Sequence, residues 1–128
     1  HGMAYNIECA YTPYTDTGLF SVYFGTDQKS HKRAEKLIMK EFQVLRERPL
    51  GARQLTELKR QVLGHIALGQ DSGNSVMTSL GKSFLLYNRV ESLDRVFDSI
   101  SNVSAEDLQR LACDVLQPEA ISHLVYTG

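Results

Sequence analysis

The four histidines are the first side chains to consider, because imidazole is a common ligand of catalytic zinc. A zinc hydrolase usually holds its metal with two histidines on one helix face and uses a nearby glutamate as general base. The histidines here are His1, His31, His65 and His123. They lie too far apart for an H-x-x-x-H or H-x-x-E-H spacing. The sequence therefore predicts no local metal site in this chain.

Each internal histidine has a simpler interpretation than metal binding. His31 lies in a polar run at a helix start, where we expect solvent exposure. His65 follows the apolar stripe of another helix, where we expect a half-buried imidazole, and His123 falls in the last predicted strand. The two cysteines, Cys9 and Cys113, are too few for a disulfide framework and are expected to be small buried side chains. A long-range disulfide is the alternative.

Other catalytic signatures are also missing from the sequence. It contains no G-x-S-x-G turn that would carry a nucleophilic serine, and neither cysteine lies in a recognisable catalytic setting. The run from Gly69 to Gly73 lacks the preceding strand and the following Lys-Ser/Thr of a phosphate-binding loop. The residues alone predict neither a nucleophile nor a nucleotide site.

Length and composition indicate an ordinary globular domain. The chain has 128 residues, of which 42% are hydrophobic and 23% charged, and its net charge is −1. So small a charge argues against nucleic acid or an anionic membrane as the main partner. No apolar run reaches the ~20 residues that span a bilayer, and the sequence does not open with a charged-then-apolar leader. We expect one soluble domain over residues 1–128, located in the cytoplasm.

Charge is distributed unevenly along the chain. Residues 27–60 hold ten Lys and Arg against five Asp and Glu, whereas residues 61–128 hold four against eight. A basic helix face in contact with water explains the first segment. An acidic ligand or RNA is the alternative, but Glu35, Glu41 and Glu47 interrupt the basic residues and no RNA-binding aromatic pattern accompanies them.

Hydrophobic periodicity predicts a hairpin at the start of the chain. Alternation predicts a strand from Met3 to Thr12 and a second from Leu19 to Phe24, which Gly25 ends. The turn formers between Thr12 and Gly18 would join them as an antiparallel pair. Apolar residues occupy both faces of this hairpin.

The remaining chain changes to helical spacing. We expect five helices and a closing strand: a first helix capped by Thr26 or Asp27 and stopped by Pro49, further helices along 55–66, 76–87, 93–100 and 105–116, and a strand from Ile121 to Tyr126. Ser92 would cap the fourth helix, and Ser104 with Asp107 would form a capping-box variant before the fifth. This order predicts an α+β fold, with a helical layer on one face of an antiparallel sheet. Three strands leave sheet edges that need partners.

Several of these segments resemble the pitrilysin/insulinase family of zinc metallopeptidases, which includes the mitochondrial processing peptidase. The resemblance covers nearly the whole chain and rests on five segments in order: Gly2 to Tyr5, Tyr11 to Phe20, Tyr23 to Asp27, Leu80 to Lys82 and Ser104 to Ala112. It is to the second domain of the family's two-domain unit, which carries no zinc. The chain, which begins His1-Gly2-Met3, would then be a fragment of that domain.

The resemblance implies a role for one residue. In the family, the first domain holds zinc through H-x-x-E-H, and the second closes over it to enclose a peptide. An Arg and, seven positions later, a Tyr of the second domain reach the active site. Tyr5 matches that Tyr, whereas the Arg would fall two positions before His1. Tyr5 would donate a hydrogen bond to the developing oxyanion. The alternative interpretation is that Tyr5 is simply one of the aromatic residues on its strand face and has no catalytic role.

The leading hypothesis is thus a C-terminal fragment of a zinc endopeptidase, inactive alone, with zinc expected in the missing N-terminal domain. Its partners would be that catalytic domain and a peptide substrate. One alternative is a non-catalytic homologue that acts as a partner or scaffold subunit. Another is a free-standing binding domain that forms homo-oligomers through its sheet edges. An upstream H-x-x-E-H motif would separate the first hypothesis from the other two.

Overall fold

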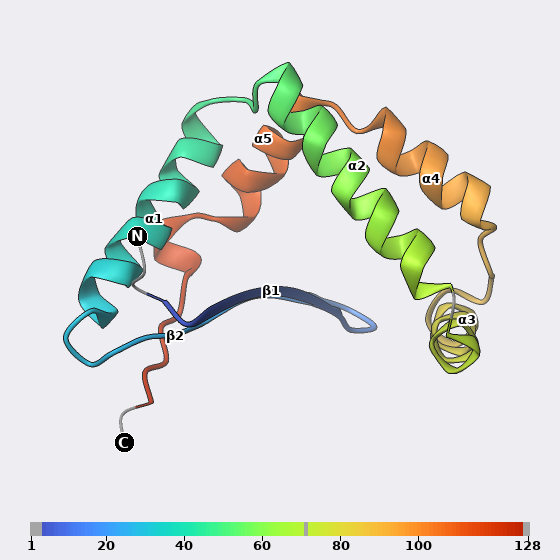
Figure 1. Ribbon diagram of the computed structural model, residues 1–128, viewed down its shortest axis with the longest axis horizontal. Helices are drawn as coiled ribbons and strands as arrows, with labels where there is room; N and C mark the ends of the chain where they lie inside the picture. Colours follow the sequence, from blue (N-terminus) through green and yellow to red (C-terminus); the bar gives the residue numbers. More distant parts are fainter. Residues whose placement is uncertain (1–3, 71, 127–128) are drawn as a thin grey trace. The chain divides into compact units, whose positions relative to one another are not determined.

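The computed structural model describes residues 4–70 and 72–126 of the chain. Figure 1 shows their order, with helices following an N-terminal hairpin: β1 (Asn6–Pro13), β2 (Gly18–Gly25), α1 (His31–Glu47), α2 (Ala52–Gly69), α3 (Gly73–Tyr87), α4 (Leu93–Asn102), α5 (Ala105–Val115) and the 3₁₀ turn η1 (Pro118–Ala120). The predicted α+β class is confirmed. The chain divides into two compact units, a hairpin unit (His1–Pro49 with Gln109–Gly128) and a helical unit (Leu50–Leu108).

The predicted hairpin is present. β1 and β2 pair antiparallel, with Tyr11 opposite Phe20 and Pro13 opposite Gly18, and the Tyr14 N–H donates to Thr17 O over 2.9 Å in the connecting loop. A Cβ at position 18 would lie 2.7 Å from the Tyr11 ring, so that exposed side chain would have to move for any other residue. Twelve of the sixteen residues of the two strands are exposed, and the other four are half-buried. Met3, the predicted first residue of the strand, lies outside the described residues.

The first helix begins later than its sequence suggests. Thr26 and Asp27 are not its caps, because α1 starts at His31 with Ser30 as the N-cap residue. Asp27 instead closes a turn, in which its carbonyl accepts from the N–H groups of Ser30 (2.9 Å) and His31 (3.1 Å). This turn leaves the Asp27 side chain available for another partner. The helix ends at Glu47, two residues before Pro49, as the ring of that proline requires.

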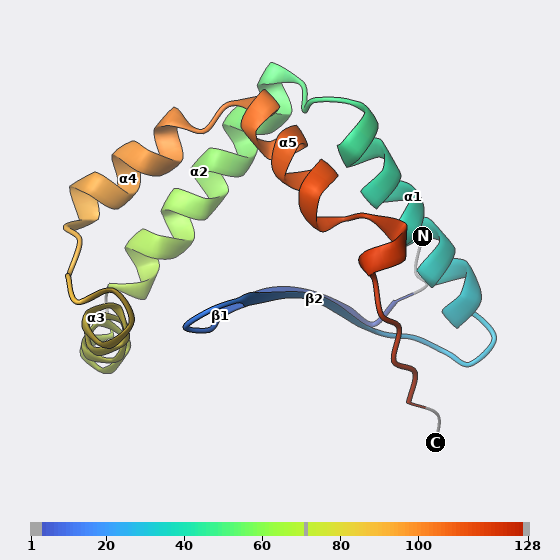
Figure 2. The same ribbon diagram turned by 180° about the vertical axis from the view of Figure 1, so that it is seen from behind.

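The core of the hairpin unit lies between α1 and the C-terminal part of the chain. Its buried apolar side chains are Ala34, Ala112 and Leu116. Figures 1 and 2 show α1 and α5 on the same side of the hairpin. Gln109 Nε2 and Cys113 Sγ both donate to the Arg46 carbonyl, over 3.0 and 3.4 Å. These bonds satisfy a carbonyl in the last turn of α1, which has no partner within its own helix.

In the helical unit, α4 begins where its predicted cap, Ser92, places it, whereas α2 and α3 each begin three residues before the expected starts at 55 and 76. The Ser92 hydroxyl accepts from Arg95 N–H over 3.4 Å at the start of α4. At its C-terminus, the Ser101 carbonyl accepts from Lys59 Nζ of α2 over 2.6 Å. Asn88 ends α3 in the left-handed conformation, at φ 51°, which asparagine tolerates better than most residues. No helix among the described residues is long and apolar enough to cross a membrane.

The prediction of a closing strand is wrong. Residues 121–126 follow η1 as an irregular segment, and in the described part of the chain β1 and β2 form a sheet of two strands only. A strand is stable only when its N–H and C=O groups find a neighbouring ladder. The alternation from Ile121 to Tyr126 supplies a suitable side-chain pattern, but no third strand within residues 4–70 and 72–126 pairs with the hairpin.

Candidate functional site

Tyr5 lies immediately before β1, where the hairpin ladder fixes its backbone. Its N–H donates to Gly25 O over 2.8 Å, so the ladder continues one residue past the strand. On the neighbouring pair, the Asn6 carboxamide oxygen accepts from Gly25 N–H over 3.1 Å. These bonds hold the main chain of Tyr5 against the end of β2. The side chain itself is 78% exposed, so it is not packed into the core of the hairpin unit.

The Tyr5 hydroxyl has a carboxylate partner, since its O–H donates to Asp27 Oδ1. Asp27 lies two residues past the end of β2, on the turn that leads into α1. The two side chains are therefore brought together by the antiparallel pairing of the hairpin, which places residue 5 beside residues 25–27. Sequence reasoning assigned Asp27 to helix capping and missed this contact.

Asp27 changes the acidity of Tyr5. The hydrogen bond to its carboxylate, followed by the negative charge of that group, raises the pKa of Tyr5 above the ordinary 10.0, and burial contributes least. The direction follows from charge repulsion, because a phenolate would stand beside a carboxylate. Tyr5 therefore stays a neutral phenol, and a potential hydrogen-bond donor, to higher pH than a free tyrosine.

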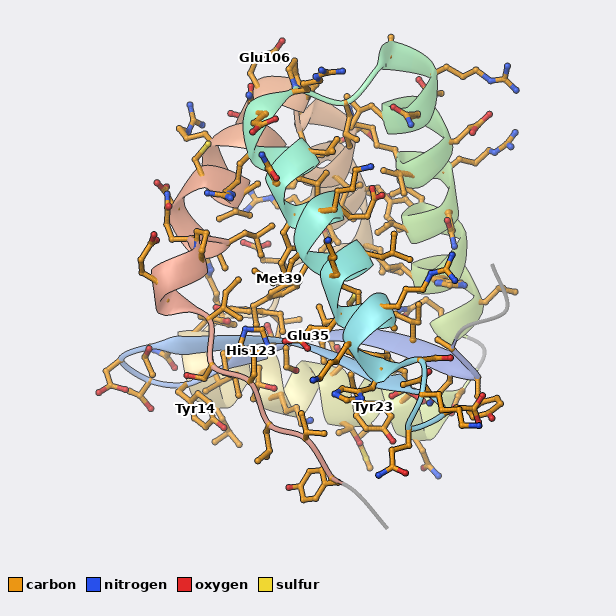
Figure 3. All side chains as sticks on the ribbon, turned by 90° about the vertical axis from the view of Figure 1, so that its left-hand side faces the viewer. Tyr14, Tyr23, Glu35, Met39, Glu106 and His123 are labelled. Atoms are coloured by element: carbon orange, nitrogen blue, oxygen red, sulfur yellow. The ribbon has the colours of Figure 1, made fainter. Side chains whose placement is uncertain are left out.

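A second polar pair in the hairpin unit joins the C-terminal segment to α1. His123 Nδ1 lies 2.9 Å from Glu35 Oε1, with the two side chains 45% and 37% exposed. Figure 3 shows them next to each other. Glu35 is one of the acidic residues that interrupt the basic residues of α1, and its carboxylate is paired with His123. The pair anchors the irregular segment and brings no further titratable side chain to Tyr5.

The other histidines and cysteines form no site among the described residues. His31 Nδ1 lies 3.0 Å from Gln28 O at the start of α1, whereas His65 is exposed and not half-buried as expected. Cys9 is also exposed and Cys113 is half-buried, whereas both were expected to be buried, and both thiols are free. His1 lies outside the described residues. Within residues 4–70 and 72–126, no group of three His, Cys, Asp or Glu could hold a metal ion.

Comparison with known proteins shows the relationship behind these features. The family model described as the Peptidase M16 inactive domain matches residues 1–62, which include Tyr5 and Asp27. An uncharacterised zinc protease of Bacillus subtilis, YmxG, is 27% identical over 111 residues. The first 62 residues of the chain therefore resemble the M16 peptidase family. The chain corresponds to the C-terminal domain of such a peptidase, which confirms the resemblance to the pitrilysin/insulinase proteins.

Further M16 relatives extend the similarity over most of the chain. The beta subunit of the mitochondrial-processing peptidase of Saccharomyces cerevisiae is 22% identical over 113 residues, which is 87% of this chain. A solved chain of complex III2 from Candida albicans, with Inz-5 bound, has the same fold, with a TM-score of 0.77 and 18% identity over 84% of this chain. The chain spans about a quarter of the length of these proteins, 24% and 26% respectively.

Proposed function

We propose that this chain is the zinc-free part of an M16 metalloendopeptidase, that it helps to enclose the peptide substrate, and that it supplies the Tyr5 hydroxyl to the active site. Zinc and its ligands would come from the N-terminal domain of the full-length protein. The similarity to proteins named zinc proteases supports this assignment. The chain alone is then expected to be inactive, because a donor without the metal cannot activate water.

The observation that carries the role of Tyr5 is its exposed hydroxyl on a fixed backbone. A donor for an oxyanion must be in place once the substrate is bound, before the transition state is reached, and a fixed main chain limits the movement that this requires. The bonds from Tyr5 N–H to Gly25 O and from Gly25 N–H to Asn6 Oδ1 supply that rigidity. The exposed ring then leaves the hydroxyl within reach of a peptide that binds over the start of β1.

Replacing Tyr5 by phenylalanine in the full-length protein tests this role. Tyr5→Phe removes one oxygen and keeps the exposed ring, so folding should not change. We expect kcat for peptide hydrolysis to fall by about 10²- to 10³-fold, as for other single oxyanion donors. KM should change far less, because the bond strengthens only as negative charge develops.

Tyr23→Phe is the matched control for that experiment. Tyr23 is an exposed tyrosine of the same hairpin, 58% accessible, and lies opposite Glu8 in the ladder. Its variant should keep the kcat of the parent protein. If Tyr5→Phe also keeps kcat, and only the melting temperature changes, Tyr5 is a structural side chain and the proposed role is wrong.

A partner or scaffold subunit is the second candidate function. It is favoured by the similarity to a protein named as a subunit, the beta subunit of the mitochondrial-processing peptidase, and by the fold shared with a solved chain of complex III2. In that case the full-length protein would lack an intact H-x-x-E-H motif and would act by binding other subunits. The two functions are separated by reading the full coding sequence and by measuring the zinc content of the full-length protein.

A further inference from the structure

The contact between Tyr5 and Asp27 constrains what the tyrosine can do. A phenol carries one hydrogen-bonding proton, and the hydroxyl oxygen otherwise only accepts. In this structure the proton of Tyr5 is directed at Asp27 Oδ1. Stabilising an oxyanion requires that same proton, because an oxyanion can only accept. The resting contact and the catalytic contact therefore exclude each other.

Asp27 is well suited to hold the hydroxyl. Its main chain is fixed on one side by the hairpin ladder, which ends at Gly25, and on the other by the bonds from Ser30 and His31 to its carbonyl. No ion pair with Lys or Arg engages its carboxylate within residues 4–70 and 72–126. A charged acceptor without a cation forms a stronger hydrogen bond to a phenol than a neutral acceptor does.

The contact is also one that substrate can replace. Tyr5 is 78% exposed, and its hydrogen bond to Asp27 lies at the surface, in contact with water. A hydrogen bond in water is easily exchanged for another, since water competes for both partners. Rotation of the phenol O–H, together with a small movement of the exposed ring, is enough to redirect the proton.

We infer that Asp27 is a positioning residue that holds the Tyr5 hydroxyl in a resting orientation until the substrate carbonyl takes over its proton. The inference rests on the proposed function for its catalytic consequence. Asp27 does not touch the substrate and no proton is transferred, because one hydrogen bond simply replaces another. The carboxylate keeps Tyr5 protonated, through its effect on the pKa of the phenol, and at the same time competes with the oxyanion for the donor.

The test uses Asp27→Asn in the full-length protein. The amide keeps the shape of the side chain but is a neutral and weaker acceptor. We expect kcat to rise by about threefold to tenfold, since a weaker competitor releases the donor, with a much smaller change in KM. Asp27→Ala, which removes the acceptor, should give at least the same gain. Asp16→Asn, which removes one charge in the hairpin loop, should leave kcat unchanged.

A titration provides a readout that does not depend on activity. In protein labelled with ¹³C-tyrosine, the signal lost in Tyr5→Phe identifies Tyr5, and its pKa is followed by NMR. Asp27→Asn should lower that pKa towards 10.0, because the charged neighbour is gone. The alkaline limb of the pH profile of kcat should move to lower pH in the same variant. An unchanged pKa would show that the two side chains are not in contact.

The outcomes separate the inference from the proposed function. If Tyr5→Phe lowers kcat as expected but Asp27→Asn leaves it unchanged or lowers it, Asp27 does not compete for the donor and the inference is wrong. If Tyr5→Phe has no effect on kcat, the proposed function fails, and the catalytic role of Asp27 fails with it. In the double variant Tyr5→Phe with Asp27→Asn, the gain from Asp27→Asn should disappear.

Discussion

Replacing Ser104 by alanine should measurably destabilise the start of α5. The Ser104 hydroxyl accepts from Asp107 N–H over 3.0 Å, and the Ser104 N–H donates to Asp107 Oδ2 over 3.0 Å. A further bond of 2.6 Å joins the two side chains. Ser104→Ala removes the hydroxyl bonds and leaves the N–H group of Asp107 without its capping acceptor. The bond from Ser104 N–H to the carboxylate survives, so the helix start is weakened and not abolished.

The size of the effect follows from the capping bond. Loss of an N-cap side chain costs about 1 kcal/mol, within a range of about 0.5–2 kcal/mol. Unfolding entropy is about 2.1 cal/mol/K per residue, so 1 kcal/mol over 128 residues corresponds to a melting temperature lower by about 4 °C. Because the site is half-buried, water cannot fully replace the lost acceptor, which favours the middle of the range.

Thermal unfolding followed by circular dichroism is the assay, with two comparison variants. Ser104→Thr keeps the hydroxyl and should lose less than half as much. Ser101→Ala makes the same chemical change in the last turn of α4, where the carbonyl and not the hydroxyl of Ser101 is used, and should leave the melting temperature unchanged or slightly higher. If Ser104→Ala lowers the melting temperature by less than Ser101→Ala does, the capping box contributes nothing and the reasoning is refuted.

Two further predictions concern the purified 128-residue chain. It should bind no zinc stoichiometrically and cleave no peptide, since its four histidines have no ligand spacing; one tightly held zinc ion per chain by metal analysis would contradict this. It should also self-associate at micromolar concentration, because exposed aromatic and aliphatic side chains cover both faces of the hairpin, among them Ile7, Phe20 and Tyr23. Sedimentation velocity should show dimers or larger species, and a clean monomer would count against sheet-edge pairing.

Local chemistry is the part of the fold that the sequence predicted best. Hydrophobic alternation on either side of a loop rich in turn formers identified the hairpin, and Ser92 and Ser104 marked the helix starts that they cap. These predictions were correct because each feature depends on residues only a few positions apart in the sequence. The start of α1 was misplaced for the opposite reason. Aspartate is a residue type that often caps helices, but the Asp27 side chain accepts a hydrogen bond from Tyr5, 22 residues away. Only the pairing of the hairpin strands reveals that neighbour.

The candidate site was predictable only in part for the same reason. Tyr5 was identified through a family resemblance, since nothing about a tyrosine on a strand predicts catalysis. Its partner Asp27 could have been found from the register, because an antiparallel pair that aligns Asn6 with Gly25 brings residue 5 close to residues just after Gly25. Counting back from the Pro13 and Gly18 pair, which closes the loop, gives that alignment. The strand register therefore predicts the contact between Tyr5 and Asp27, but Asp27 was interpreted as a helix cap instead.

The failed strand from Ile121 to Tyr126 and the uncovered hairpin have one physical explanation. Alternating side chains are suited to a sheet, but pairing requires a free edge aligned with the segment, and here the segment is held to α1 by His123 and Glu35. The hairpin meanwhile leaves Tyr11, Leu19 and other apolar side chains in water, at a cost of ~25 cal/mol for each Å² that burial would have removed. The chain spans about a quarter of the length of these relatives. The same exposure that makes this hairpin unfavourable alone keeps Tyr5 accessible, so burial by the rest of a longer protein must leave the start of β1 open if Tyr5 is to reach a substrate.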